Sequence, residues 1–299
     1  MRQNNEVILT MERVSFRYSP GTPFERLALI DIALRVMRGE RVAVVGQTGS
    51  GKSTLAGLCN GILKPSDGNV TVFGMDTRGD AKIQKQLRAK VGHVMQNPED
   101  QLFEQYVGDD VAFGPLKLGL TLDEARERAR SAMAAVGLDF TEKDTPIYTL
   151  SRGRKRLVAI AGILAMEPEL LILDEPTSGL DPLTAKSLLD SLSAMCEEKG
   201  TTLLLITHQL SEVLQLANRV IVMDHGKISR DGDPEAIFLA AEELPFGLDV
   251  PDEVIMAKRL QAAGVRIERK DWNAEGFAAT MANSLLNREV KDGKLTKLE

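Results

Sequence analysis

Residues 46–54 contain the clearest chemical motif of the sequence, a glycine-rich pattern typical of phosphate binding. They read GQTGSGKST, satisfy the spacing GxxxxGK[ST], and follow an apolar run at residues 42–45. Glycines let backbone amides curl around an anion, a helix N-terminus favours negative charge, and a lysine neutralises phosphate oxygens. The sequence therefore predicts a phosphate-binding loop (P-loop) for ATP and Mg²⁺, with Ser53 as a hydroxyl ligand of the metal. The predicted nucleotide-binding residues are Gly46, Gln47, Thr48, Gly49, Ser50, Gly51, Lys52, Ser53 and Thr54.

A pair of carboxylates follows a second apolar run, at residues 170–173. We expect Asp174 to hold the Mg²⁺ shell and Glu175 to polarise an attacking water. Taken alone, the pair is as typical of a charged residue cluster at a strand end as of a catalytic site. Together with the P-loop it predicts ATP hydrolysis.

The segments around these residues indicate an α/β fold. Short apolar runs alternate with stretches of helical period such as residues 185–196, a pattern typical of a parallel sheet covered by helices. The expected core strands are residues 42–45, 170–173, 203–206 and 220–223.

Two regions depart from this alternation. The segment from about residue 96 to residue 165 lacks strong strand signals. This pattern predicts a helical insertion, with a charged helix at 122–136. Beyond residue 235, prolines precede two amphipathic patterns. We therefore expect an ATPase domain at 1–235 and a small helical C-terminal appendage at 236–299, which either pairs two ATPases or pads its own core. Its expected helices are 254–263 and 274–286, and residues 288–299 are expected to be frayed.

Composition excludes several classes of function. A net charge of −6 gives no basic field for nucleic acid, so no nucleic-acid partner is expected. Cys59 and Cys196 lie far apart, without a CxxC pair, which argues against a zinc or disulfide scaffold. No stretch approaches the roughly 18 apolar residues of a membrane-spanning helix, and the first residues lack the pattern of a signal peptide. We expect a soluble, cytoplasmic chain.

Further residues, in order along the chain, resemble the motifs of the ATP-binding-cassette (ABC) ATPases. Gln96 opens the helical insertion as the family's Q-loop glutamine does, and residues 150–154 stand where its signature loop belongs. Residues 178–181 match its D-loop, His208 its switch histidine, and Tyr18 the aromatic residue that stacks on adenine. Taken alone, Tyr18 is as typical of an ordinary half-buried strand residue as of an adenine-stacking one. Taken alone, His208 is more typical of a hydrogen-bonded polar residue at a strand end than of a catalytic group. In this order around a P-loop they form a specific pattern over residues 10–235.

The resemblance implies a RecA-like parallel-sheet core with an antiparallel β edge and a helical subdomain. It also implies that two such cores face each other, each nucleotide lying between one P-loop and the other core's signature loop. Glu175 would then be the general base, His208 would stabilise the γ-phosphate, and Gln96 would contact the metal. Across the pair, Ser151, Gly153 and Asp181 would contact the partner's nucleotide.

Phrases outside the catalytic motifs are similar to the ATPases of energy-coupling-factor (ECF, CbiO-like) transporters, which import vitamins or cobalt and nickel ions. The resemblance implies a second ATPase subunit, the same or different, a transmembrane T component and a substrate-binding S component. It places the chain on the cytoplasmic face of the cell membrane, peripherally, through its transmembrane partner. The transported substrate would be set by another chain. The phrases lie at residues 60–65, 96–103, 110–115, 159–162 and 247–251.

The signature loop departs from the family's LSGGQ because it reads LSRGR, with Arg152 and Arg154. Further basic residues follow at a helix N-terminus, an unfavourable arrangement without a nearby anion. The arginines either hold the partner's γ-phosphate or wedge the interface open where glycine allowed close approach. We favour the wedge. The altered loop leaves open a nucleotide-binding regulatory partner with impaired hydrolysis. A second alternative is a soluble ABC ATPase outside transport, which would use the same cassette.

Overall fold

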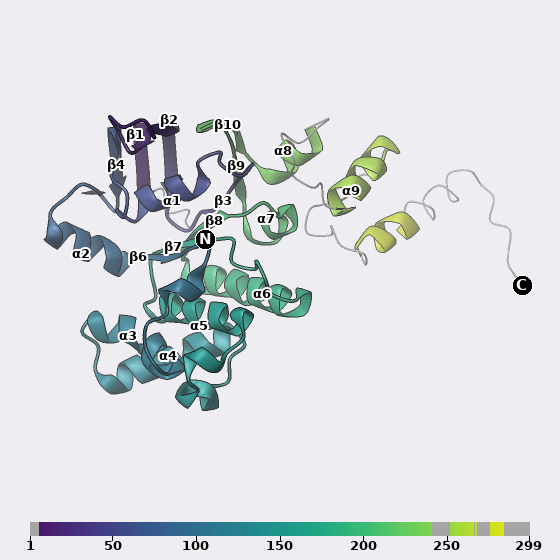
Figure 1. Ribbon diagram of the computed structural model, residues 1–299. Helices are drawn as coiled ribbons and strands as arrows, with labels where there is room; N and C mark the ends of the chain where they lie inside the picture. Colours follow the sequence, from purple (N-terminus) through teal and green to yellow (C-terminus); the bar gives the residue numbers. More distant parts are fainter. Residues whose placement is uncertain (1–5, 241–251, 266, 268–275, 284–299) are drawn as a thin grey trace, which may run out of the picture.

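Two β-sheets form the centre of the computed structural model, which describes residues 6–240, 252–265, 267 and 276–283 (Figure 1). Within these residues the larger sheet has six strands, and all its pairs are parallel except β9 with β10. In spatial order they are β10 (Lys227–Gly232), β9 (Arg219–Asp224), β3 (Arg41–Gly46), β8 (Thr202–Ile206), β7 (Leu170–Asp174) and β6 (Val91–Val94).

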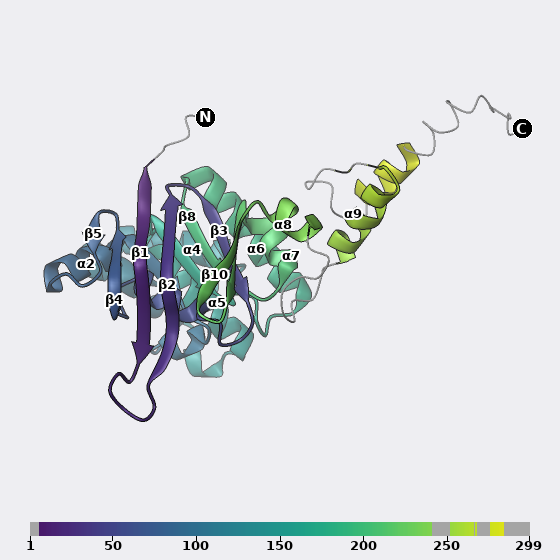
Figure 2. The same cartoon turned by 90° about the horizontal axis from the view of Figure 1, so that it is seen from above.

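The second sheet is antiparallel and lies beside the first (Figure 2). Its strands, in spatial order, are β2 (Arg26–Met37), β1 (Val7–Tyr18), β4 (Asp67–Val72) and β5 (Met75–Asp76). Strands β1 and β2 form a long hairpin that pairs Tyr18 with Arg26 near its tip. The expected parallel core with an antiparallel β edge is confirmed.

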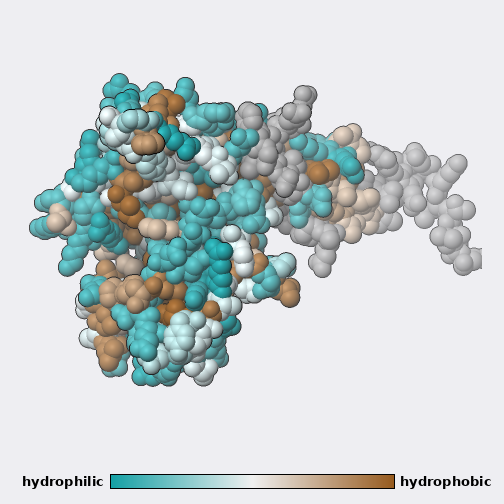
Figure 3. Space-filling model, viewed as in Figure 1, coloured by the Kyte–Doolittle hydropathy of each residue, from teal (hydrophilic) through white to brown (hydrophobic). Residues whose placement is uncertain are grey.

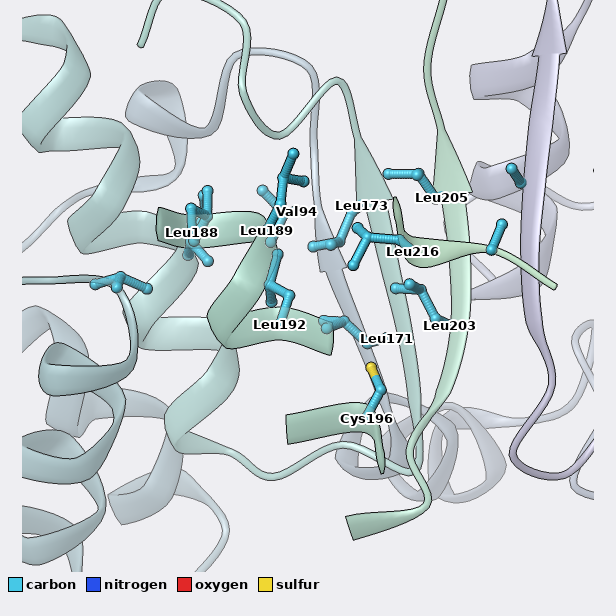
Figure 4. Packing of buried hydrophobic residues seen from close by; sticks show 14 of the residues in the cluster. Val94, Leu171, Leu173, Leu188, Leu189, Leu192, Cys196, Leu203, Leu205 and Leu216 are labelled. Atoms are coloured by element: carbon cyan, nitrogen blue, oxygen red, sulfur yellow. The ribbon is translucent and has the colours of Figure 1, made fainter. Parts of the chain in front are cut away.

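Alternation along the parallel strands creates two apolar layers, because successive strand residues face opposite sides of a sheet. Ala43 and Val45 join the cluster on the side of the helical insertion, whereas Val42 and Val44 join the cluster shared with α1 and the antiparallel sheet. Figure 4 shows leucines of β7 facing leucines of α6 (Pro182–Lys199), and leucines of β8 beside Leu216 of α7 (Leu210–Leu216). Each such buried side chain contributes roughly 1.5–3 kcal/mol relative to exposure. This packing fixes the strand ends on which the site depends.

The helices divide between the sheet and the insertion. Helices α3, α4 and α5 pack on one another below the parallel sheet in Figure 1. They are accompanied by short 3₁₀ helices, η1 (Pro98–Gln101), η2 (Phe140–Asp144) and η3 (Ile147–Thr149). The α-helices are α1 (Lys52–Cys59), α2 (Ala81–Lys90), α3 (Val107–Lys117), α4 (Leu122–Ala135), α5 (Arg152–Ala165), α6 (Pro182–Lys199), α7 (Leu210–Leu216), α8 (Pro234–Ala240) and α9 (Asp252–Ala262).

The elements expected from the sequence are present with small shifts at their ends. The four expected core strands correspond to β3, β7, β8 and β9, and the helices expected at 122–136 and 185–196 to α4 and α6. Helix α9 covers most of the expected 254–263, and residues 276–283 are helical. The rest of 274–286, and all of 288–299, lie outside the described residues. None of the described helices is long and apolar enough to cross a membrane.

Candidate active site

The carboxyl ends of β3, β7 and β8 meet at one edge of the parallel sheet, where α/β proteins commonly bind ligands. Strand β3 ends at Gly46, β7 at Asp174 and β8 at Ile206, and Asp174 is in register with Ile206. The P-loop, the two carboxylates and His208 therefore begin from neighbouring strand ends. Strand β3 is buried from Val42 to Gly46, and β7 and β8 are buried along their whole length, so the core holds these strand ends in place.

The P-loop has a backbone that needs glycine. Gly46 has φ +150°, and a Cβ there would lie 2.2 Å from the carbonyl oxygen of Met223. Gly51 has φ +105°, and its Cβ would lie 2.7 Å from the Ala28 carbonyl oxygen. Helix α1 starts directly afterwards, which directs its first amides toward the loop. The buried Ser50 hydroxyl has no hydrogen-bond partner among the described residues. The loop thus has the form of an anion cradle.

Lys52 lies across this cradle. Its Nζ donates to the carbonyl oxygens of Gly46, at 2.7 Å, and Gln47, at 2.9 Å. Burial lowers the pKa of Lys52, while Glu175 and Asp174 oppose that shift. The ammonium thus sits at the mouth of the loop, where a phosphate oxygen can replace carbonyl oxygens as its acceptor.

Asp174 and Ser53 have the donor chemistry of a Mg²⁺ site. Burial raises the pKa of Asp174, a hydrogen bond from the Ser53 hydroxyl lowers it, and Glu175 raises it further. Among the described residues, no group of three or more His, Cys, Asp or Glu is placed to hold a metal by itself. Mg²⁺ prefers a few protein oxygens together with phosphates and water. Asp174 and Ser53 therefore fit a cation that a nucleotide's phosphates help to bind.

Glu175 is held in a rare conformation for a residue other than glycine. Its φ is +52°, in the left-handed region. Its Oε1 lies 2.7 Å from Nδ1 of the exposed His208, and its buried Oε2 has no partner among the described residues. One carboxylate oxygen thus contacts the histidine, while the other is buried and makes no hydrogen bond among the described residues. The structure thus brings Glu175 and His208 into contact.

One cavity of about 300 Å³ joins most of the expected nucleotide-site residues. The Tyr18 hydroxyl, at its rim, lies 3.0 Å from Oγ1 of Thr54, and its ring packs edge-on against Phe16. Gln96 lines the same cavity. The lining residues are Tyr18, Arg26, Ala28, Thr48, Gly49, Gly51, Lys52, Ser53, Thr54, Gln96, Asp174 and Glu175.

Arg26 is a member of this cavity that sequence reasoning missed. It lies opposite Tyr18 in the β1–β2 hairpin, and its Nη2 donates to the Gly49 carbonyl oxygen at 3.4 Å. The guanidinium therefore lies beside Gly49 of the P-loop. Only the strand register shows which residue lies across from Tyr18.

Replacing Arg26 with Ala is expected to weaken ATP binding by roughly two- to fivefold, the effect of one exposed charge contact. The reason is that its cation lies beside the cradle where phosphate charge would be placed. Equilibrium titration with a fluorescent ATP analogue measures the affinity. Arg17→Ala is the matched control, because Arg17 lies on the same hairpin and pairs with Glu25 at 3.8 Å. Equal affinities for the two variants would contradict a role for Arg26.

A second cavity, of about 730 Å³, contains the expected signature loop and D-loop. Ser151 caps helix α5, since its hydroxyl accepts from the Arg154 amide at 3.4 Å. Asp181 caps α6 by accepting from the amides of Leu183 and Thr184. A Cβ on Gly153 would lie 3.4 Å from Leu180, so the two loops are in close contact. The structure thus places Ser151, Gly153 and Asp181 together, but apart from the P-loop cavity.

The signature arginines are paired within the chain itself. Arg152 forms an ion pair with Glu99 through its Nε, and its Nη2 donates to Asn97 Oδ1 at 3.3 Å. Arg154 pairs with Glu142. The expected crowding of positive charge is therefore offset by two carboxylates of the same chain, an arrangement that neither the phosphate nor the wedge interpretation foresaw. These partners lie 53 and 12 residues away in sequence, too far for spacing to reveal.

The sequence matches a known family over the same residues. A model of the family described as ABC transporter matches residues 29–178, which run from β2 to the turn after Glu175. The chain belongs to the ABC transporter family. It is accordingly an ABC-type ATPase, and the expected ATP-binding, α/β cassette fold is confirmed.

Several similar proteins within this family are ATP-binding proteins of energy-coupling factor (ECF) transporters. The energy-coupling factor transporter ATP-binding protein EcfA2 of Caldanaerobacter subterraneus subsp. tengcongensis is 43% identical over 260 residues, which cover 87% of this chain and 91% of that protein. EcfA2 of Enterococcus faecalis is 40% identical over 289 residues, 96% of this chain and 99% of that protein. The resemblance to ECF transporter ATPases is confirmed.

Solved structures of ABC proteins have the same fold. CbiO1 from Clostridium perfringens, part of the ABC transporter complex cbiONQ, superposes with a TM-score of 0.71 at 37% identity, covering 86% of this chain and 95% of that one. A dimeric ATP-binding cassette bound to ADP and Pi gives a TM-score of 0.70 at 27% identity, covering 76% of this chain and 99% of that one. This ABC chain thus resembles one cassette of a dimer.

Proposed function

We propose that this chain is the ATP-hydrolysing motor subunit of an ECF-type importer for vitamins or for transition-metal ions such as cobalt and nickel. One observation carries the proposal: the P-loop, Asp174 and Glu175 line one cavity at one sheet edge, His208 contacts Glu175 there, and the signature loop lies in a separate cavity. Such a chain holds two unlike halves of a nucleotide site. A second ATPase subunit, identical or different, completes both.

Hydrolysis by this site follows from the positions of its side chains. Lys52 and the P-loop amides would hold the phosphates, and Asp174 and Ser53 would hold Mg²⁺, which neutralises charge on the phosphate oxygens. Oε2 of Glu175, which has no partner among the described residues, would accept a proton from the attacking water. His208 would stabilise the γ-phosphate, Gln96 would contact the metal, and the Tyr18 ring would stack on adenine.

The helical insertion offers a surface for a transmembrane partner. In Figure 3 brown hydrophobic residues gather over the region where Figure 1 places α3 and α4. Phe103 is 61% exposed and packs edge-on against Phe113. Such a patch on a water-exposed helical unit marks a docking surface. We define the exposed apolar patch as the exposed large hydrophobic side chains of the insertion, which are Phe103, Tyr106, Leu116, Leu118, Leu122 and Tyr148.

The proposal includes the remaining parts of the assembly. A transmembrane T component would dock on this surface and hold the chain peripherally at the cytoplasmic face of the cell membrane, and a separate S component would capture the substrate. Residues 1–235 would form the ATPase domain and 236–299 the appendage. Buried residues of the appendage, Phe238, Val254 and Leu260 among them, join the same apolar cluster as α6 and α7. Packing of the appendage against α6 and α7 favours a role in the core of its own chain over a role in pairing two ATPases.

Isolation of the chain from membranes, as a tagged bait, tests the proposed function. Recovery of a small subunit with several membrane spans, together with an ATPase subunit, is the expected result. A bait that carries Phe103→Asp and Leu122→Asp controls for nonspecific capture, because both side chains lie in the exposed apolar patch. Recovery of ribosomes or DNA in place of a membrane subunit would overturn the proposal in favour of a soluble ABC ATPase.

The altered signature loop favours one other function, a regulatory partner with impaired hydrolysis. Reverting Arg152→Gly together with Arg154→Gln is expected to raise ATPase turnover of the isolated complex by roughly tenfold, the effect of about one recovered hydrogen bond. The reason is that Arg152 is exposed beside the cavity where backbone amides must approach the partner's phosphate. Phosphate release measures the turnover.

Lys155→Gln serves as the control for that reversion, because it removes a positive charge from the same helical turn without adding a glycine. Its turnover is expected to match the wild type. An unchanged rate in the double variant, with its melting temperature preserved, would rule out the wedge interpretation.

A further inference from the structure

Arg156 lies one turn after Arg152 on helix α5 and carries a guanidinium buried inside the protein. The residue is only 2% exposed. Its Nη1 donates to the carbonyl oxygen of Glu175 at 2.7 Å, and its Nη2 donates to the carbonyl oxygen of Gln96 at 3.0 Å. Both acceptors belong to residues of the candidate active site. A buried arginine therefore joins the signature helix to the loops after β6 and β7.

The contact with Glu175 acts on a backbone that needs support. Glu175 has φ +52°, a conformation that side-chain-bearing residues rarely adopt. Its N–H donates to Ile206 O at 2.9 Å, and its carbonyl accepts from both Arg156 and the Ser178 N–H, the latter at 3.2 Å. These bonds set the direction of the carboxylate, whose Oε1 meets His208. Arg156 supplies the charge-assisted bond among them.

The contact with Gln96 reaches the other side of the same cavity. Gln96 follows β6 and lines the cavity together with Glu175. A planar guanidinium presents several donors in a fixed fork, so it can hold two carbonyl oxygens at a set separation. Arg156 thus fixes the spacing between the Gln96 and Glu175 loops.

Glu99 extends this connection to the signature loop. One of its carboxylate oxygens pairs with Arg152, and the other lies 3.8 Å from Nη2 of Arg156, an ion pair too long for a hydrogen bond. Arg152 and Arg156 also share one face of α5, being four residues apart. A displacement of the signature loop at the start of α5 would therefore shift Arg156 in two ways, through the helix backbone and through the contact with Glu99.

We infer that Arg156 is a positioning residue that holds Glu175 and Gln96 in place and transmits the state of the signature loop to them. The signature loop of one chain would contact the partner's nucleotide. The nucleotide at one site of the pair would therefore influence the catalytic carboxylate of the other. This inference rests on the proposed function, because it requires a paired ATPase.

The variant Arg156→Lys tests it in the isolated complex. Lysine keeps the charge but lacks the fork that spans two carbonyls. We expect kcat to fall about tenfold, while ATP affinity stays near the wild-type value because the P-loop contacts are untouched. The melting temperature should fall by only a few degrees, the effect of about one lost buried hydrogen bond. The matched control is Arg128→Lys, in a surface ion pair with Glu167 at 2.7 Å, which should leave all three quantities unchanged.

Two results would overturn the inference. One is an unchanged kcat in Arg156→Lys, and the other is a parallel loss of kcat, ATP affinity and melting temperature, the signature of a merely structural role. If this variant does not fold, Glu99→Gln decides, since it leaves Arg156 in place. A lowered kcat with unchanged ATP affinity supports transmission, and an unchanged kcat refutes it. Absence of hydrolysis by the wild-type complex would instead contradict the proposed function.

Discussion

Replacing Glu175 with Gln is expected to leave ATP bound but unhydrolysed. Removal of a general base costs about 10²- to 10⁴-fold in rate, so turnover at this chain's site should fall by at least about 100-fold. Gln retains the size and hydrogen-bonding ability of the side chain but cannot accept the water's proton. The free Oε2 in its buried setting is the atom that would do so. Phosphate release and equilibrium binding of a fluorescent ATP analogue measure the two quantities.

The control for this variant is Glu198→Gln, an exposed carboxamide substitution on α6 away from the P-loop. It should hydrolyse ATP at the wild-type rate. A Glu175→Gln chain that retains hydrolysis would show that another group activates the water. Loss of ATP binding together with hydrolysis would instead show that Glu175 mainly supports the fold of the turn after β7.

Replacing Lys52 with Ala is expected to weaken ATP binding by roughly 10- to 100-fold, the range for a lost hydrogen bond to a charged group. In the structure Lys52 Nζ already lies at the P-loop, bound to the Gly46 and Gln47 carbonyl oxygens. A triphosphate would offer this cation charged acceptors. Without the cation, phosphate charge would face the two carboxylates 174 and 175 with one fewer compensating charge.

Titration with the same fluorescent analogue measures this loss. Lys82→Ala, on the exposed side of α2, removes a lysine far from the cavity and should bind ATP as the wild type does. Comparable affinities for Lys52→Ala and Lys82→Ala would contradict the assignment of residues 46–54 as the phosphate site.

The parts of the site that the sequence predicted are those whose geometry is local. The P-loop needs only a strand, a glycine-rich turn and a helix start within a few residues. The apolar run before Asp174 predicted that both carboxylates follow a buried strand, and parallel pairing then brings them to the same edge as Gly46. For the same reason the core strands were predicted to within a residue or two.

The parts that the sequence did not predict depend on contacts between distant residues. Arg26 enters the cavity because the hairpin register sets it against Tyr18. In the sequence Arg156 is only one of several basic residues near Gly153. In the structure its side chain is buried and donates to the carbonyl oxygens of Glu175 and Gln96, which are 19 and 60 residues away along the chain. Helical spacing indicates which face a residue occupies, but not which loop packs against that face.

The measurement that tests the account most directly is phosphate release by the membrane complex isolated on a tagged wild-type chain and on a tagged Glu175→Gln chain. We expect the same membrane subunits in both preparations. We also expect the Glu175→Gln complex to lose at least about half of the ATPase rate, because one of the two sites of an ABC pair depends on this carboxylate. An ATPase rate that is unaffected by Glu175→Gln in a complex of unchanged composition would contradict it.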